Sequence, residues 1–243
     1  QERGATMARS LLRMLRTLFT FGFTDLENKE CERLCNVMSK LRFPMPPKRN
    51  SVITADQVIA IRAKAHEMGH HSIALANALQ FECLFRQKDV IGEWVPDGEP
   101  GLSAVSYAGK KWLRGIRWNE IDDKLILRHT TSKRQKDIEI NLHLAPMVME
   151  ELARFGDTLP SSGPMIVRES TGRPWRTVDY RVKWREIARA CGIPDSVKNM
   201  DNRAGGITEA SNAGVPLEHI RHAATHSDIQ TTQGYSRDGA EKT

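Results

Sequence analysis

The chain has 243 residues, of which 40% are hydrophobic and 27% are charged. This composition is ordinary for a globular protein that buries a core, and it excludes a disordered or fibrous chain. Because the length exceeds the usual size of one domain, we expect one full-sized domain and a smaller piece. The formal charge of +6 and the pI of about 9.3 are compatible with a polyanionic partner but are not specific to one.

The longest apolar stretches fall short of the roughly 20 residues that a membrane span needs, and no signal peptide precedes the first basic segment. We therefore expect a cytoplasmic protein. The four cysteines have the spacing of neither a disulfide framework nor a zinc ribbon, so we expect reduced structural thiols. Since the chain opens on Gln1 with a helical pattern already under way, we expect its true N-terminus to lie upstream.

Apolar residues recur at helical spacing between arginines from Ala5 to Phe21, which predicts an amphipathic helix with a basic face. A second helix is expected from Thr24 to Leu41. The next stretch, Arg42 to Asn50, holds three prolines and three basic residues, as is typical of an extended linker. We place the domain boundary there, between residues 1–49 and residues 50–243.

Thr54, followed three residues later by Gln57, forms a capping-box pattern that predicts the start of a helix ending at Gly69. A further helix is expected from Ser72 to Phe85. The segment from Gly92 to Lys111 is rich in Gly, Pro and Ser, which predicts a long loop.

Three segments then show strand-like alternation, from Gly115 to Trp118, from Lys124 to His129 and from Asp137 to Leu142, and predict a small antiparallel sheet. After Ala145 the chain is again mainly helical, with an interruption around residues 163–175. The predicted class is therefore α+β, mainly α: a helical domain with a small antiparallel β-sheet, preceded by a partial helical N-terminal domain.

One motif points to a different chemistry. His66, Glu67 and His70 match H-E-x-x-H, in which two histidines on one face of a helix bind zinc. Gly69 falls inside the motif, where the preceding helix is expected to end, so His70 should point away from His66. We therefore predict no metal site here and interpret these histidines as a solvated helix end.

The segment from Ala224 to Tyr235 contains a histidine, His226, nine residues before Tyr235, with threonines between them. This pattern resembles the end of the catalytic domain of the tyrosine recombinases of the phage-integrase type, in which a histidine in a turn precedes the nucleophilic tyrosine. The family's usual glycine before the histidine is Thr225 here. The resemblance implies that Tyr235 is the nucleophile.

A second motif of the family has a counterpart upstream. Arg203 matches the second catalytic arginine, at the end of the family's H-x-x-R motif, and Met200 occupies the position of that motif's histidine. A thioether can neither accept nor donate the proton that the histidine handles. We expect Asp201 to be the N-cap of the helix that carries Arg203, and Gly214 to end that helix.

Arg86 follows a long apolar helix and has Asp89 three positions later, which resembles the setting of the family's first catalytic arginine. Lys133 lies in the polar turn before the last predicted strand and resembles the family's β-hairpin lysine, with Lys136 as the competing residue. The resemblance covers residues 53–237 in motif order and spacing. The helices before the linker resemble the end of the family's DNA-clamping core-binding domain.

These residue types suit the cleavage of a phosphodiester. Two forked guanidiniums, those of Arg86 and Arg203, can neutralise the charge that grows on the phosphate in the transition state. A cationic pocket lowers the cost of forming phenolate from Tyr235, because a phenol has an ordinary pKa of about 10. Lys133 would protonate the departing 5′ oxygen as general acid, and His226 would hydrogen-bond a phosphate oxygen.

The resemblance implies a site-specific DNA recombinase, or integrase, that cleaves and rejoins DNA strands through a 3′-phosphotyrosine intermediate without a metal or cofactor. The expected partner is double-stranded DNA, with a homotetramer on two DNA sites and a monomer or dimer when free. The expected location is the cytoplasm, in association with the nucleoid and not with a membrane. The alternative, motivated by Met200, is a catalytically impaired relative that binds a specific DNA sequence. Tyr107, in the predicted loop, and Tyr180, in a predicted amphipathic helix, have no histidine nine residues before them.

Overall fold

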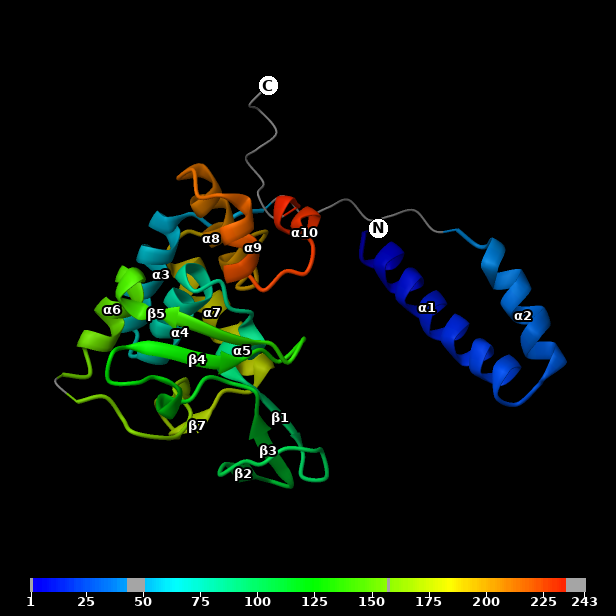
Figure 1. Cartoon of the computed structure of the whole chain (residues 1–243), viewed down its shortest axis with the longest axis horizontal. Helices are drawn as coiled ribbons and strands as arrows, with labels where there is room; N and C mark the ends of the chain where they lie inside the picture. Colours follow the sequence, from blue (N-terminus) through cyan, green and yellow to red (C-terminus); the bar gives the residue numbers. More distant parts are fainter. Residues whose placement is uncertain (1, 43–50, 157, 235–243) are drawn as a thin grey trace. The chain divides into compact units, whose positions relative to one another are not determined.

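The computed structural model describes residues 2–42, 51–156 and 158–234 (Figure 1). The chain divides into two compact units, Gln1–Asn50 and Ser51–Thr243. Apart from Arg42, the predicted linker lies outside the described residues. No helix in the described part of the chain is both long and apolar enough to cross a membrane.

The first unit is a pair of helices, α1 (Glu2–Thr24) and α2 (Lys29–Lys40). Helix α2 begins where it does because the Asn28 side chain accepts a hydrogen bond from the Cys31 N–H at 3.0 Å, which satisfies one of the free donors of the first turn. Both predicted helices are present. The predicted start of the second helix was wrong, because Thr24 ends α1 and α2 begins at Lys29.

The second unit consists mainly of helices with short antiparallel sheets, which confirms the predicted class, α+β and mainly α. Its elements in chain order are α3 (Ala55–Glu67), α4 (His71–Glu82), α5 (Gln87–Ile91), β1 (Glu93–Pro96), β2 (Ser106–Tyr107), β3 (Lys110–Leu113), the 3-10 turn η1 (Trp118–Glu120), β4 (Ile126–Thr130), β5 (Asp137–Asn141), the 3-10 turn η2 (Leu142–Leu144), α6 (Pro146–Ala153), β6 (Val167–Arg168), β7 (Arg173–Pro174), α7 (Thr177–Ala190), α8 (Asp201–Asn212), α9 (Leu217–Ala223) and α10 (Ile229–Gln233).

Helix α4 is the centre of this unit. All ten residues from Ser72 to Phe81 are buried, and α3, α6 and α8 pack against it. The oxygen of its buried Asn77 side chain accepts two hydrogen bonds, from Trp184 Nε1 at 3.0 Å and from Asn202 Nδ2 at 2.7 Å. These bonds tie α4 to α7 and α8 and satisfy the buried amide oxygen.

Helix α8 approaches its neighbours so closely that two of its positions admit only glycine. A Cβ atom at Gly206 would lie 2.0 Å from the carbonyl oxygen of Phe81, and one at Gly205 would lie 2.2 Å from that of Ile53. Both obstacles are backbone atoms, so no side chain can move aside. This packing holds the first turn of α8, which carries Arg203, against the end of α4.

The strand predictions are only partly right. The predicted strands 124–129 and 137–142 form the hairpin β4–β5, with Leu127 opposite Ile140. The predicted strand 115–118 was wrong: within it only Arg117 makes an isolated bridge, to Pro164, and Trp118 begins a 3-10 turn. The predicted loop 92–111 was also wrong, because it holds most of a separate sheet in the order β1-β3-β2. Backbone pairing with β3 imposes the extended form of β1, whose residues show no alternation.

The predicted signals at the ends of α3 and at the end of α8 are confirmed, whereas α4 ends at Glu82 and not at the predicted Phe85. Thr54 and Gln57 form both bonds of a capping box, and Gly69 follows α3 with a φ of +72°. Gly214, with a φ of +81°, follows the end of α8 as expected. The N-cap of α8 is Met200, so the prediction of Asp201 was wrong. The Asp201 carboxylate lies in the first turn and accepts a hydrogen bond from the Lys198 N–H at 2.8 Å.

Candidate active site

Arg203 is held in place by two backbone carbonyl groups from different parts of the fold. Its side chain is buried, with 6% of the residue exposed. One terminal nitrogen donates to the carbonyl oxygen of Leu84, after α4, and the other to that of Ala224, after α9. Leu84 has a φ of +55°, so the chain reverses sharply there. Arg203 thus joins α4, α8 and α9 at one point with its guanidinium fixed.

Arg86 lies two residues beyond that reversal, as the N-cap of α5. A quarter of its side chain is exposed, and its Nη1 lies 3.8 Å from Oδ2 of Asp89. Asp89 is fully buried. Its other carboxylate oxygen accepts a hydrogen bond from the Ser132 N–H at 2.7 Å. A single carboxylate therefore anchors both Arg86 and the turn between β4 and β5.

This turn carries the two lysines that the sequence offers as the general acid, Lys133 and Lys136. Lys133 follows Ser132 directly, and both Lys133 and Lys136 are exposed. The turn is closed by a hydrogen bond from the Thr131 N–H to the Lys136 carbonyl at 2.9 Å. In the described part of the chain neither lysine forms an ion pair with a carboxylate. Both ammonium groups are therefore available to an added anion.

His226 is buried, with 4% of the residue exposed, and its Nδ1 shares a hydrogen bond of 3.0 Å with the Thr232 hydroxyl of α10. Burial, together with the smaller effect of the positive charges of Arg203, Arg86 and Arg134, lowers its pKa to about 4. The imidazole is therefore neutral at neutral pH. Arg203 bonds to the carbonyl group of Ala224, two residues before His226, and to that of Leu84, two residues before Arg86, so the chain positions of all three meet at this point.

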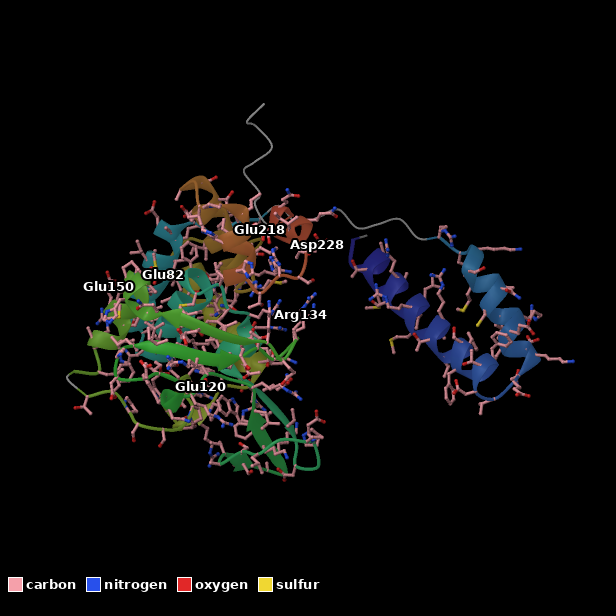
Figure 2. The ribbon with its side chains drawn as sticks, viewed as in Figure 1. Glu82, Glu120, Arg134, Glu150, Glu218 and Asp228 are labelled. Atoms are coloured by element: carbon pink, nitrogen blue, oxygen red, sulfur yellow. The ribbon has the colours of Figure 1, made fainter. Side chains whose placement is uncertain are left out.

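Arg134 is the residue that sequence reasoning missed. It follows Lys133 in the β4–β5 turn and is exposed, and Figure 2 shows it at the end of the hairpin, on the side of the unit that carries α10. Its position beside Lys133 in the same polar turn was the available signal, but the family resemblance points to a lysine there and not to an arginine.

Thr225 occupies a backbone conformation that suits glycine. Its φ is +52°, a value that is a genuine outlier for a β-branched residue. Its hydroxyl is buried and has no hydrogen-bond partner among the described residues. The turn that presents His226 thus forms despite Thr225, with the Arg221 guanidinium donating to the His226 carbonyl oxygen at 3.2 Å.

Met200 lies at the start of α8, one helical turn before Arg203. It is 64% exposed, whereas Arg203 is buried. Positions three apart on a helix are neighbours, so Met200 stands at the solvent-exposed end of the helix face that carries Arg203.

Tyr235 lies outside the described residues. Of the other two tyrosines, Tyr180 is fully buried, and burial raises its pKa; its hydroxyl accepts a hydrogen bond from Gln80 at 3.2 Å. Tyr107 belongs to β2 and not to a loop, and it is 54% exposed beneath the guanidinium of Arg173. A core tyrosine such as Tyr180 cannot reach a polymer substrate.

The H-E-x-x-H histidines have separate carboxylate partners. His66 Nε2 lies 2.7 Å from Oε2 of Glu151, while His70 Nδ1 lies 3.7 Å from Oε2 of Glu169. In the described ranges no group of three or more His, Cys, Asp or Glu side chains is arranged to hold a metal ion. The interpretation of these residues as a solvated helix end needs one correction, since His66 pairs with a buried glutamate.

Chemically, the cluster can bind a tetrahedral anion. The guanidiniums of Arg86, Arg134 and Arg203 contribute positive charge at a neutral imidazole, and Asp89 pairs with Arg86. Guanidinium groups bind phosphate oxygens in pairs of parallel hydrogen bonds. The lysines of the β4–β5 turn add flexible proton donors at the edge.

Solved structures share this architecture. A lambda integrase dimer bound to a COC' core site matches 98% of the chain and 61% of its own length, with a TM-score of 0.70 and 16% identity. A lambda integrase tetramer bound to a Holliday junction matches 96% of the chain and 67% of its own, with a TM-score of 0.59 and 14% identity. The Tn1549 transposon integrase (aa 82-397) with circular intermediate DNA matches 95% and 74%, with a TM-score of 0.60 and 13% identity.

At these identities the likeness establishes the fold: the chain has the fold of these DNA recombinases. It spans 61% of the length of the first of them. No protein-family model and no curated protein sequence matches the chain.

Proposed function

We propose that this protein is a tyrosine-type site-specific DNA recombinase, which cleaves and rejoins DNA strands through a 3′-phosphotyrosine intermediate on Tyr235. The observation that carries the proposal is that Arg203 bonds to the carbonyl groups of Leu84 and Ala224, which lie two residues before Arg86 and the buried His226. Two arginines 117 positions apart in the chain thus come to one buried histidine. The fold shared with DNA-bound integrases supports it.

The arginines bind and activate the scissile phosphate. Attack on a phosphodiester concentrates negative charge on the non-bridging oxygens, and fixed guanidiniums stabilise that charge more than they stabilise the ground state. Arg203 is preorganised by its two carbonyl partners, and Arg86 by Asp89. His226, being neutral, donates one hydrogen bond to a phosphate oxygen without adding to the charge.

Tyr235 supplies the nucleophile. Thr232, bonded to His226, precedes it by three residues, so the two Cα atoms can be at most about 11 Å apart at roughly 3.6 Å per residue. The proposal requires the phenol to reach the arginine cluster, and this short separation along the chain allows it. The phenol loses its proton to water, the phenolate oxygen attacks phosphorus, and the bond to the 5′ oxygen breaks. The nearby positive charge lowers the cost of forming phenolate.

Lys133 gives its proton to the departing 5′ oxygen. Its backbone neighbour Ser132 is bound by Asp89, which also holds Arg86, whereas Lys136 lies at the other end of the turn. This anchoring favours Lys133 over Lys136 as the general acid. In the second step the 5′-hydroxyl of a partner strand attacks the phosphotyrosine and releases Tyr235, so the energy of the bond is kept.

The partner is double-stranded DNA, and strand exchange needs a homotetramer on two DNA sites, built from subunits that are monomers or dimers when free. The expected location is the cytoplasm, in association with the nucleoid. The integrase structures that share this fold contain a dimer on a core site and a tetramer on a Holliday junction, which supports this assembly.

A second function, sequence-specific DNA binding without cleavage, is favoured by Met200. Its thioether stands where a proton-handling histidine is expected, and it is largely exposed. The same arginine cluster would then bind a phosphate without breaking it.

A library of nicked duplexes with random sequence separates the two functions. Release of a short strand next to the nick prevents religation, so a cleaving enzyme is trapped as an SDS-resistant adduct and the captured DNA reveals the target sequence. We expect an adduct with the native chain and none with Tyr235→Phe. DNA binding at saturation without any adduct would favour the second function.

A further inference from the structure

A pocket of about 360 Å³ lies outside the arginine cluster, between the sheet β1-β3-β2, the β6–β7 hairpin and the start of α7. Figure 1 shows β1 leaving the main body close to α5, with the sheet projecting from the unit. The pocket is held together by a hydrogen bond of 3.1 Å from Trp94 Nε1 of β1 to the carbonyl oxygen of Pro174 of β7. The projecting sheet is thus fixed against the hairpin and does not hang free.

The lining of this pocket is strongly basic. It contains four cations and one carboxylate, which leaves three positive charges in excess: Lys110, Arg168, Arg173 and Arg176 against Asp179. The carboxylate is already engaged, because Arg176 donates to both oxygens of Asp179 at 2.6 and 2.9 Å. Among the described residues, Lys110, Arg168 and Arg173 form no ion pair.

Two of these arginines lie on aromatic rings. The guanidinium of Arg173 is 3.8 Å from the ring centre of Tyr107, and that of Arg168 is 5.6 Å from the ring centre of Trp175. Stacking orients a guanidinium while leaving its in-plane N–H groups free, and a stacked arginine loses less conformational entropy when it binds an oxyanion. Aromatic support without a carboxylate partner suits a site that binds an anion, because a carboxylate would compete with it.

The pocket is connected to the candidate active site through α7. Arg181 of α7 donates from Nε to Oε1 of Gln87, the residue next to Arg86, at 3.2 Å. Arg176, at the pocket, precedes Arg181 by five residues, or about 7.5 Å of helix axis at 1.5 Å per residue. One strand of DNA places a phosphate every 3.4 Å or so along the duplex axis. A duplex with one phosphate bound to Arg86 therefore has further phosphates within about 7.5 Å along its axis.

We propose that the pocket binds a phosphodiester of the DNA backbone, a few nucleotides from the scissile phosphate, through Arg168, Arg173 and Lys110. This inference rests on the proposed function for its partner. The contact is independent of base sequence, because the donors are cations without a base-reading geometry. It adds a second phosphate anchor, built on the sheet that sequence analysis interpreted as a loop.

The test measures how the affinity for a labelled duplex, several helical turns long, depends on salt. The Tyr235→Phe background removes any contribution of cleavage. The logarithm of the binding constant falls with the logarithm of the salt concentration by about 0.9 for each phosphate neutralised. We expect the double variant Arg168→Gln, Arg173→Gln to reduce this slope by about 1 to 2. The matched variant Arg154→Gln, which removes an exposed cation of the same unit, should leave the slope unchanged.

A slope equal to that of the parent, in a double variant with the parent's melting temperature, would overturn the proposal. If the double variant melts early, the single Arg168→Gln and Arg173→Gln variants replace it, each with an expected reduction of about 1. Thymidine monophosphate serves as the second probe: if it binds the parent and not the variant while the DNA slope stays unchanged, the pocket is a mononucleotide site and the DNA contact is wrong. Because no cleavage is measured, a failed adduct assay is distinguishable from a failed slope test.

Discussion

Asp89 is the residue whose removal should disturb the candidate active site most without touching DNA. Its buried carboxylate accepts a hydrogen bond from Ser132 at 2.7 Å and lies 3.8 Å from the Arg86 guanidinium. In Asp89→Ala the Ser132 N–H loses its acceptor and Arg86 loses its counter-charge. The turn that carries Lys133 is then free to move away from the phosphate.

The loss of stability expected for Asp89→Ala follows from these two contacts. A hydrogen bond to a charged group contributes about 1.5–3 kcal/mol. Breaking a buried ion pair costs about 3–5 kcal/mol, and the lower part of that range or less applies here because Arg86 is a quarter exposed. Together we expect a loss of about 3–4 kcal/mol in the free energy of unfolding, or roughly 6–16 °C in Tm for a unit of this size.

Two variants separate the loss of the charge from a general loss of stability: Asp89→Asn and Asp122→Ala. Asparagine keeps an oxygen for Ser132 but removes the charge, so we expect about half the loss of stability and a partial loss of the rate of adduct formation. Asp122 accepts backbone N–H bonds from Lys124 and Ile126 at 2.9 Å, at the other end of the β4–β5 hairpin. Asp122→Ala should therefore lower stability but keep the rate per folded molecule. An adduct rate for Asp89→Ala no lower than that of Asp122→Ala would refute the positioning role.

Three further outcomes are expected. The folded pKa of His226, about 4, lies below its ordinary value of 6.5. The stability that the neutral imidazole contributes is therefore fully present above pH 6.5 and is lost as the pH falls towards 4, by about 3 kcal/mol at most. His226→Gln should flatten this pH dependence of the free energy of unfolding in denaturant titrations, and an unchanged pH dependence would contradict the assignment. Gly206→Ala should cost several kcal/mol, on the order of the largest single-site effects, because its Cβ meets the Phe81 carbonyl oxygen at 2.0 Å; a melting temperature equal to that of the native chain would contradict the close packing. Met200→His should raise the rate of adduct formation by about 10-fold or more, as for an added general acid-base group, and an equal rate would mean that position 200 does not limit cleavage.

The class of the fold could be predicted because it depends on periodicity and on local signals. The Thr54 capping box and the glycines at 69 and 214 act within a few residues, so their effects are visible in sequence. The sheet β1-β3-β2 could not be predicted in the same way. Its strands are held by pairing between segments about twenty residues apart, such as Trp94 opposite Trp112, and no alternation marks them.

The candidate site, like the fold, could be predicted only where local sequence signals mark its residues. Arg86, Arg203 and His226 were identified from spacing, and the structure places them together, while their roles stay predictions. Neither Arg134 nor the carbonyl partners of Arg203 were predicted, because these contacts depend on how α4, α8 and α9 meet. Asp201 was misjudged as an N-cap because a short polar side chain fits the first turn equally well when it bonds back to Lys198.

The most direct test of the account is the identity of the covalent link. The adduct captured from the nicked random library is digested with trypsin and a nuclease, and the modified peptide is sequenced by mass spectrometry. We predict a single phosphonucleotide on Tyr235, attached through the 3′ end of the cleaved strand. A link to Tyr107, to a serine or to the 5′ end, or the same adduct in Tyr235→Phe, would contradict the central claim.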